Sequence, residues 1–219
     1  WINGVPLYGK EGKKFQPRSE VTLDDSVLLS GINNIIQVSC KNDNGVESLK
    51  EKFEIKNYVK DTTSYKTYLF CVSVSNYKDK KYNLKYARKD GRDLVNAFKK
   101  EFGNNIFVDT LFDEKATLKN ILAWKKIMEK TSVKDRVILY VSGHGLLDKN
   151  YDFYYATYDV DFKNPADKGL AYDEIEKLLD KIPARKKLLL MDACHSGEVD
   201  KEAVANKIPQ NSVAVNEVK

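Results

Sequence analysis

The sequence predicts an α/β fold, in which a mostly parallel, doubly wound sheet is flanked by helices and preceded by an all-β segment. Three observations predict it. From Tyr65 onward, strand-like and helix-like patterns alternate, which is typical of a parallel sheet with crossover helices. The runs Arg136–Ser142 and Lys187–Met191 are almost continuously apolar, as expected of strands buried on both faces. Residues 1–59 instead carry short β-prone runs around a tight-turn signal.

The β-prone runs of the first segment are Phe15–Leu29, Ile32–Cys40 and Val46–Ile55, and Asn42–Gly45 supplies the turn signal. This pattern resembles the closing strands of an immunoglobulin-like sandwich. A complete sandwich of that kind has about seven strands, so we expect its first strands to lie upstream of Trp1 or to be missing. Because the chain does not begin with methionine, we expect a fragment of a longer protein.

The alternating part has apolar residues at helical spacing in two long segments and in one shorter segment. Thr117 is the expected cap of the second helix. After Gly197 the chain becomes polar and weakly patterned, which predicts a linker over 198–219. The expected elements are strand Tyr68–Val74, helix Ala87–Phe102, strand Ile106–Phe112, helix Leu118–Met128, strands Arg136–Ser142 and Phe153–Tyr158, helix Tyr172–Asp180 and strand Lys187–Met191.

Composition and charge exclude several classes of protein. The net charge of +5 arises from 37 basic and 32 acidic residues, and no basic stretch is interleaved with stacking aromatics, so we expect no nucleic-acid partner.

No run approaches 18 consecutive apolar residues, so we expect no membrane span. Cys40, Cys71 and Cys194 form neither a CxxC pair nor an even set. This cysteine usage favours a reducing compartment, and we expect a cytoplasmic protein.

Two predicted strands end in loops rich in chemically active residues. The first loop reads Val-Ser-Gly-His-Gly and contains His144, and the second reads Asp-Ala-Cys-His-Ser-Gly and contains Cys194. Sites in open α/β sheets gather beyond the carboxyl ends of the strands, so the two loops can converge. An imidazole close to a thiol promotes the thiolate that attacks a carbonyl. Flanking glycines let backbone amides turn towards a developing oxyanion.

These two motifs at this spacing resemble the caspase, metacaspase and paracaspase group of cysteine peptidases. The resemblance covers Tyr65–Gly197, the large-subunit portion of that fold, so 60–197 is the expected catalytic domain. It implies that Cys194 is the nucleophile and His144 its general base, and that the backbone N–H groups of Gly145 and Cys194 form the oxyanion hole. We expect no cofactor and no metal, because His144, Cys194 and His195 lack standard ligand spacing.

The resemblance also bears on specificity. Caspases carry Gln-Ala-Cys at the nucleophile, whereas this chain has Asp192 two residues before Cys194. In metacaspases and paracaspases, which cleave after Arg or Lys, an aspartate at that position lines the specificity pocket, and a second comes from the start of the first helix. Asp90 matches the second position. Two carboxylates would favour a cation, although Asp90 as a helix cap and Asp192 as a turn residue are the plainer alternatives.

The resemblance finally predicts self-processing and a partner. In this group, strands that complete the sheet follow an inter-subunit linker. We expect Lys219 to be a self-cleavage point, with the small C-terminal fragment remaining bound; an arbitrary end of the sequence is the alternative. Expected partners are protein or peptide substrates. Two other functions stay open: a non-catalytic interaction module on the same fold, and a different thiol hydrolase that acts on small esters or amides.

Overall fold

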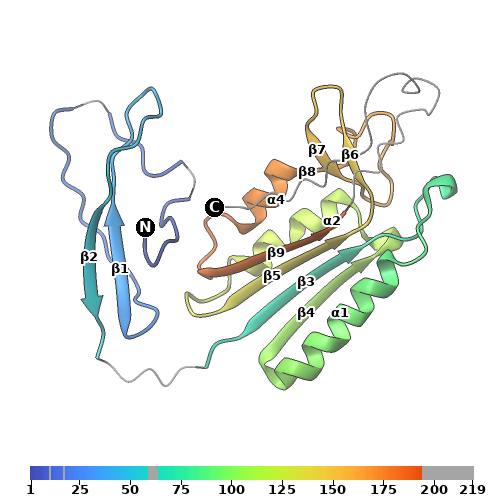
Figure 1. The fold of residues 1–219 in the computed structure, drawn as a ribbon, viewed down its shortest axis with the longest axis horizontal. Coiled ribbons are helices and arrows are strands. Elements are labelled where there is room, and N and C mark those ends of the chain that lie inside the picture. Colours follow the sequence, from blue (N-terminus) through green and yellow to red (C-terminus); the bar gives the residue numbers. More distant parts are fainter. Residues whose placement is uncertain (10, 17, 59–63, 194–219) are drawn as a thin grey trace, which may run out of the picture.

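A computed structural model describes residues 1–9, 11–16, 18–58 and 64–193 of the chain (Figure 1). The strands are β1 Asn33–Val38, β2 Glu51–Lys56, β3 Thr67–Ser73, β4 Ile106–Phe112, β5 Arg136–Ser142, β6 Gly145–Leu147, β7 Phe153–Tyr155, β8 Leu170–Ala171 and β9 Lys186–Asp192. The α-helices are α1 Ala87–Phe102, α2 Leu118–Ala123, α3 Lys125–Met128 and α4 Tyr172–Leu179. Short 3-10 helices are η1 Lys80–Tyr82, η2 Gly103–Asn105 and η3 Asp113–Lys115.

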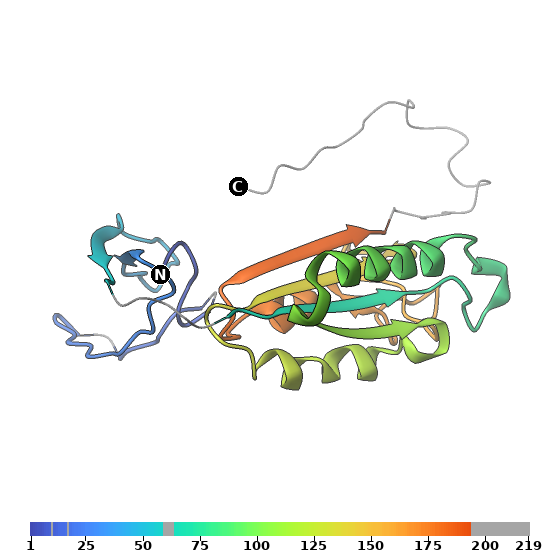
Figure 2. The same cartoon turned by 90° about the horizontal axis from the view of Figure 1, so that it is seen from below.

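A parallel four-stranded sheet in the order β4-β3-β5-β9 forms the centre of the fold. Its strands run in one direction because each is joined to the next by a helical crossover. Helix α1 covers one face and α2 covers the other, as seen along the sheet in Figure 2. The sequence prediction of a parallel sheet flanked by helices is therefore confirmed.

Alternate residues of the two central strands enter different cores, because side chains of a strand point to opposite faces in turn. In β3, Phe70 and Val72 belong to the larger core, whereas Leu69 and Cys71 face α1. All four side chains are fully buried. Because β3 is buried on both faces, polar and apolar residues do not alternate along its sequence. The larger core also contains Trp124, Met128, Val137, Leu139, Val141, Ile175 and Leu178.

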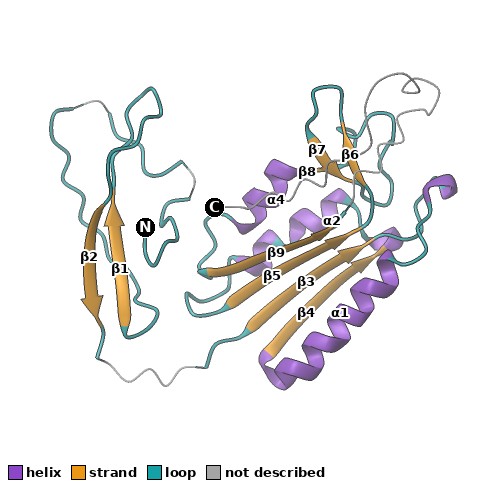
Figure 3. Ribbon diagram, viewed as in Figure 1, coloured by secondary structure: helices purple, strands orange, loops and turns teal. Residues whose placement is uncertain are grey.

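A small antiparallel sheet of β6, β7 and β8 lies at the carboxyl ends of the parallel strands (Figure 3). The sequence predicted one strand over Phe153–Tyr158, but the strand ends at Tyr155. The residues that follow use their backbone groups elsewhere: Ala156 N–H donates to His144 O, and Tyr158 N–H donates to Ala116 O. The hairpin thus ties the loop after β5 to the rest of the domain.

One predicted helix is divided in the structure. The helix expected over Leu118–Met128 is two short helices, α2 and α3, which meet at Trp124. Thr117 caps α2 as expected, its hydroxyl accepting from Asn120 N–H. The indole of Trp124 donates to Asp109 on β4 and its ring packs on Phe70, so the tertiary contacts of Trp124 coincide with the break.

The N-terminal segment contains one described two-stranded sheet, in which β1 and β2 pair antiparallel around the predicted turn, where Gly45 N–H donates to Asn42 O. The strand expected within Phe15–Leu29 was wrong: the described residues there form no strand. Arg185 donates to Leu28 O and to Ser30, which ties this stretch to the loop before β9. The immunoglobulin-like assignment stays a prediction. Among the described residues, no helix is long and apolar enough to cross a membrane.

Close packing of α1 on β3 depends on Gly91. A Cβ at this position would lie 2.3 Å from Ser73 Oγ, 3.1 Å from Ser73 Cβ and 3.2 Å from Cys71 Sγ. No side chain fits at such distances, so the first turns of α1 approach the sheet only through glycine. This contact positions the start of α1, which carries Asp90.

We expect Gly91→Ala to lower the free energy of unfolding by about 1–3 kcal/mol, because the added methyl group overpacks the contact with Ser73. The effect opposes the higher helix propensity of alanine. Urea denaturation followed by circular dichroism measures it. Asn96→Ala, at an exposed position of the same helix, is the matched control and should change stability by less than about 0.5 kcal/mol. Equal stability of Gly91→Ala and the wild type would contradict this packing argument.

Candidate active site

The carboxyl ends of the parallel strands bring together residues that are far apart in the sequence. Strand register places Ser73, Ser142 and Asp192 in one row across β3, β5 and β9. The hydroxyl of Ser142 donates to Asp192 Oδ2 at 3.3 Å, and Gly143 N–H donates to Asp192 O at 3.2 Å. The loops that follow β5 and β9 therefore start side by side, as the rule for open α/β sheets predicts.

A pocket of about 300 Å³ opens at this edge of the sheet. Three of the predicted site residues line it together: His144 from the loop after β5, Asp90 from α1 and Asp192 from the end of β9. The remaining lining residues are Leu84, Lys85, Tyr86, Ala87, Ser142 and Gly143. Gly145 does not line the pocket, and Cys194 and Lys219 lie outside the described residues.

The main chain of His144 is fixed on both sides. Gly143 has φ +154°, and a Cβ there would lie 2.8 Å from Tyr77 Oη and 3.1 Å from the Tyr155 ring, so a larger residue cannot be accommodated. Tyr77 Oη accepts a hydrogen bond from His144 N–H at 2.9 Å, and Tyr155 Oη donates to Ser142 O at 3.0 Å. Burial raises the pKa of both phenols, which keeps them neutral.

The imidazole of His144 is also oriented. Its Nε2 lies 2.8 Å from the backbone oxygen of Tyr82. Since a carbonyl only accepts, Nε2 carries the proton in this arrangement, and this contact favours the Nε2–H tautomer. Three aromatic rings surround the imidazole, with centroid distances of 5.3 Å to Tyr77, 5.7 Å to Phe162 and 6.5 Å to Tyr82.

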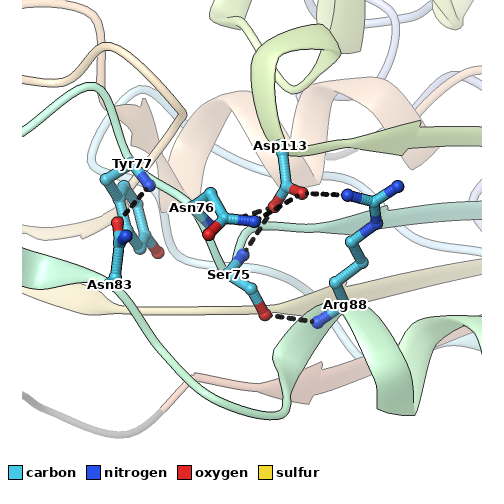
Figure 4. Close-up of polar contacts among 6 residues, drawn as sticks. All are labelled: Ser75, Asn76, Tyr77, Asn83, Arg88 and Asp113. Atoms are coloured by element: carbon cyan, nitrogen blue, oxygen red, sulfur yellow. Dashed lines mark hydrogen bonds and ion pairs between the residues drawn. The ribbon is translucent and has the colours of Figure 1, made fainter. Parts of the chain in front are cut away.

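The loop that supplies the Tyr82 carbonyl is held by the buried carboxylate of Asp113 (Figure 4). Asp113 Oδ1 accepts from the N–H groups of Ser75 and Asn76 at 2.9 and 3.0 Å, and Oδ2 accepts from the Asn76 amide at 3.1 Å. Arg88 Nη1 on α1 donates to Oδ2 at 2.7 Å. Further along, the N–H of Tyr77 donates to the Asn83 side chain, which closes the loop around η1.

The ionisation of Asp113 reflects two opposing influences. Burial has the largest single effect on the pKa and disfavours the ionised form. Hydrogen-bond donors from Asn76 and Ser75, together with the positive charge of Arg88, nevertheless hold the pKa of Asp113 below its ordinary value of 3.8. The side chain is only 1% exposed. Asp113 thus remains a carboxylate at neutral pH, and its four acceptor contacts fix the loop on which His144 depends.

The two pocket aspartates differ in how they are supported. Asp90 lies in the first turn of α1, but the N-cap residue is Tyr86, and the first-turn N–H of Arg88 donates to Ser75 Oγ at 2.8 Å, so the alternative role of Asp90 as a cap is contradicted. Asp192 is exposed at the end of β9. Both contribute negative potential: burial is the main cause of the raised pKa of Tyr140, and the charges of Asp192 and Asp90 add to it.

The backbone of Gly145 is arranged differently from that of His144. Ala156 N–H donates to His144 O, which extends the hydrogen-bond pattern of the antiparallel ladder by one step, whereas His144 N–H donates to Tyr77 Oη and not to Ala156. The next pair, Gly145 with Tyr155, is then a non-hydrogen-bonded pair, so the Gly145 N–H points away from β7. Gly145 is buried, and its role at an oxyanion stays a prediction.

The other cysteines differ in their exposure. Cys71 is fully buried on β3, where desolvation raises the pKa of its thiol to about 12, with a smaller opposing effect from Ser73. Such a thiol is not a nucleophile at neutral pH. Cys40 is exposed in the N-terminal segment and does not line the pocket. In the described part of the chain, no group of three or more His, Cys, Asp or Glu side chains is arranged to hold a metal ion.

Sequence reasoning missed Tyr77, Tyr82, Asp113 and Phe162. The position of Asp113 in the sequence could have indicated a role at the site, because it directly follows β4. The same holds for Ser75, which follows the end of β3 by two residues. The rule that sites gather beyond the carboxyl ends of strands applies to all four parallel strands, not only to the two with His144 and Cys194. For the aromatic rings no such signal exists, since they lie in loops without a repeating pattern.

A histidine and two carboxylates line one pocket at the carboxyl edge of a parallel sheet, where the active sites of open α/β enzymes gather. The sequence model of the caspase domain family (Peptidase C14) matches residues 68–217, so the chain belongs to this family of cysteine peptidases. The crystal structure of protein GSU0716 from Geobacter sulfurreducens is similar, with 26% identity over 63% of this chain and a TM-score of 0.49. The matched part spans 54% of that protein. No curated protein matches.

We expect Asp113→Asn to lower the free energy of unfolding by about 3 kcal/mol, because an NH₂ group replaces an oxygen that faces only donors. The folded pKa lies below the unfolded value near 3.8, so the unfolded state binds more protons between these two pKa values. The stability due to the charge is therefore complete above about pH 4 and is lost as pH falls through the folded pKa.

Urea titrations of both proteins between pH 2 and pH 7 measure this difference. The gap between wild type and Asp113→Asn should narrow at the acid end. Glu114→Gln, at the exposed neighbouring position, is the control and should leave stability nearly unchanged. A gap that stays constant over the whole pH range would show that the charge of Asp113 is not the source of the stability.

Proposed function

We propose that this chain is the catalytic segment of a cysteine endopeptidase that cleaves after Lys or Arg through a Cys194–His144 dyad. The observation that carries the proposal is the common pocket lined by His144, Asp90 and Asp192. Membership of the caspase domain family supports the class of reaction. The pocket supports the specificity, because it combines an oriented imidazole with two carboxylates.

The position of Asp192 supports the approach of Cys194 to His144. Ser142 and Asp192 are partners in the sheet, and each motif places its reactive residue two positions later. Ala193 still packs against the main core. The matching two-residue spacing after a paired row of the sheet supports the proposed pairing of Cys194 with His144.

The proposed reaction follows from these positions. The Cys194 thiolate attacks the carbonyl carbon of the peptide bond and forms a C–S bond. With Nε2 committed to the Tyr82 carbonyl, Nδ1 of His144 takes the thiol proton and gives it to the leaving amine as the C–N bond breaks. Water then hydrolyses the acyl-enzyme with His144 as base. The N–H groups of Gly145 and Cys194 are the proposed donors to the oxyanion. No step requires a cofactor.

We expect Cys194→Ala to abolish cleavage of a fluorogenic arginyl peptide, and His144→Ala to lower kcat by at least about a thousandfold, since the thiol loses its base. His195→Ala is the matched control and should keep the activity, because adjacent side chains do not meet in attack geometry. An arginyl chloromethylketone should label Cys194 in the wild type only.

Other results would overturn the dyad in specific ways. Turnover by His144→Ala at the wild-type rate would exclude this residue as the base. Absence of both labelling and cleavage would favour a non-catalytic interaction module, and turnover of small esters without any peptide cleavage would favour a different thiol hydrolase.

For specificity, we expect Asp90→Asn and Asp192→Asn each to lower kcat/KM for arginyl and lysyl peptides about 10- to 100-fold, the value of a lost charge-assisted hydrogen bond. The measurement uses peptides that differ only at the residue before the cleaved bond. Asp93→Asn is the control: Asp93 lies on the same helix, is paired with Lys89 at 2.5 Å and does not line the pocket. Preferred cleavage after aspartate would defeat the specificity proposal.

A further inference from the structure

We propose that Tyr82 and Phe162 form an aromatic clamp that positions His144 for proton transfer. The proposal rests on the proposed function, because it concerns the base of that reaction. Neither residue touches the reacting atoms, so both are positioning residues. They act through the carbonyl that holds Nε2 of the imidazole.

The clamp is a close, nearly parallel ring stack. The centroids of Tyr82 and Phe162 are 3.5 Å apart, and the planes differ by 10°. The Phe162 ring then meets the imidazole of His144 edge-on at 5.7 Å and an angle of 83°. Tyr77 closes the other side, with its ring 5.3 Å from Phe162 and 5.3 Å from His144. The imidazole therefore lies against rings that also contact one another.

The two clamp residues come from different loops. Tyr82 ends η1 in the loop between β3 and α1, and Phe162 lies in the loop between β7 and β8. A backbone hydrogen bond from Lys78 N–H to Tyr158 O joins the same two loops at 2.9 Å. The stack is a second link, four residues further along each loop. Together with the contact between the Tyr77 and Phe162 rings, these links restrict movement of one loop against the other.

The second link matters because of where the Tyr82 carbonyl lies. Asp113 holds the start of the loop at Ser75 and Asn76, whereas the carbonyl that accepts from His144 Nε2 is six residues beyond Asn76. The stacked Tyr82 ring belongs to the same residue as this carbonyl. Loss of the stack would remove the contact of Tyr82 with the opposite loop and leave this end of the loop held only by its own hydrogen bonds, such as Leu84 N–H to Ser75 O. A shift of about 1 Å in a catalytic group can cost a hundredfold in rate.

The loop of Phe162 is itself well anchored. The Thr157 hydroxyl donates to Lys168 O at 2.8 Å, and Lys168 forms an ion pair with Asp159 at 3.3 Å. Gly169 N–H donates to Pro165 O at 3.0 Å. These contacts hold the loop that carries Phe162, so the Tyr82 ring packs against a side chain whose backbone is well supported.

The geometry separates this role from substrate binding. Tyr82 and Phe162 do not line the pocket that contains Asp90 and Asp192. We therefore expect Phe162→Leu to lower kcat for an arginyl peptide by about 10- to 100-fold while KM changes by less than about threefold. Phe162→Tyr keeps the ring and should restore most of kcat. Phe102→Leu removes a tilted ring pair at the far end of α1, where the centroids of Phe98 and Phe102 are 5.7 Å apart, and is the control for loss of an aromatic pair.

A spectroscopic readout tests the clamp without any substrate. The chain has two histidines, so His195→Gln leaves His144 as the single imidazole for ¹⁵N NMR. In the full chain with the clamp intact, we expect neutral His144 to be the Nε2–H tautomer; in Phe162→Leu we expect a mixture of tautomers. Tyr82→Leu removes the same stack from the other loop and replaces Phe162→Leu if that variant does not fold.

The outcomes are distinct. A changed tautomer population together with a fall in kcat supports the clamp. An unchanged tautomer in a folded Phe162→Leu or Tyr82→Leu variant overturns it, as does a KM rise with kcat preserved. If the wild type cleaves no peptide, the proposed function fails, while the tautomer measurement still decides whether the stack orients His144.

Discussion

The hydrogen bond between His144 Nε2 and the Tyr82 carbonyl is the constraint on which the candidate site depends. An imidazole can exchange a proton at one nitrogen in a defined direction only if the other nitrogen is held. Here the partner is a backbone oxygen, whose position is set by the fold of a loop and not by a side-chain rotamer. Gly143 and Tyr77 fix the main chain of His144, and the ring contacts limit its side chain.

The site joins parts with different mechanical support. Asp192 and Ser142 are neighbours because of the parallel register of β5 and β9, although β9, with Leu188 and Met191 exposed, is not the doubly buried strand that its apolar sequence predicted. Asp90 is placed by a helix that approaches the sheet through Gly91. The imidazole alone depends on loops. The two aspartates are therefore placed by rigid elements, and the orientation of the imidazole is set by loop contacts.

Much of the fold was accessible from the sequence, for reasons that also explain the failures. The strand Arg136–Ser142 and the helix Ala87–Phe102 were predicted with their observed bounds. A doubly buried strand requires consecutive apolar residues and an amphipathic helix requires apolar residues at helical spacing, and both patterns are visible in the sequence. Phe15–Leu29 failed because β-prone composition does not supply a pairing partner. His144, Asp90 and Asp192 were predicted from motifs and line one pocket, whereas Phe162 was not predicted, since a ring stack between two loops depends on tertiary structure alone.

The buried charge of Asp113 explains why the loop after β3 holds its shape although η1 has no buried residue. A carboxylate that is 1% exposed is costly unless donors surround it. Its donors are Ser75, Asn76 and Arg88, all from this loop or the start of α1. A movement at the start of the loop would strip the charge of its partners, so the penalty for an unpaired carboxylate opposes that movement. The start of the loop that orients His144 is thereby fixed by electrostatics, whereas its end at Tyr82 is held by the ring contact with Phe162 and by hydrogen bonds within the loop.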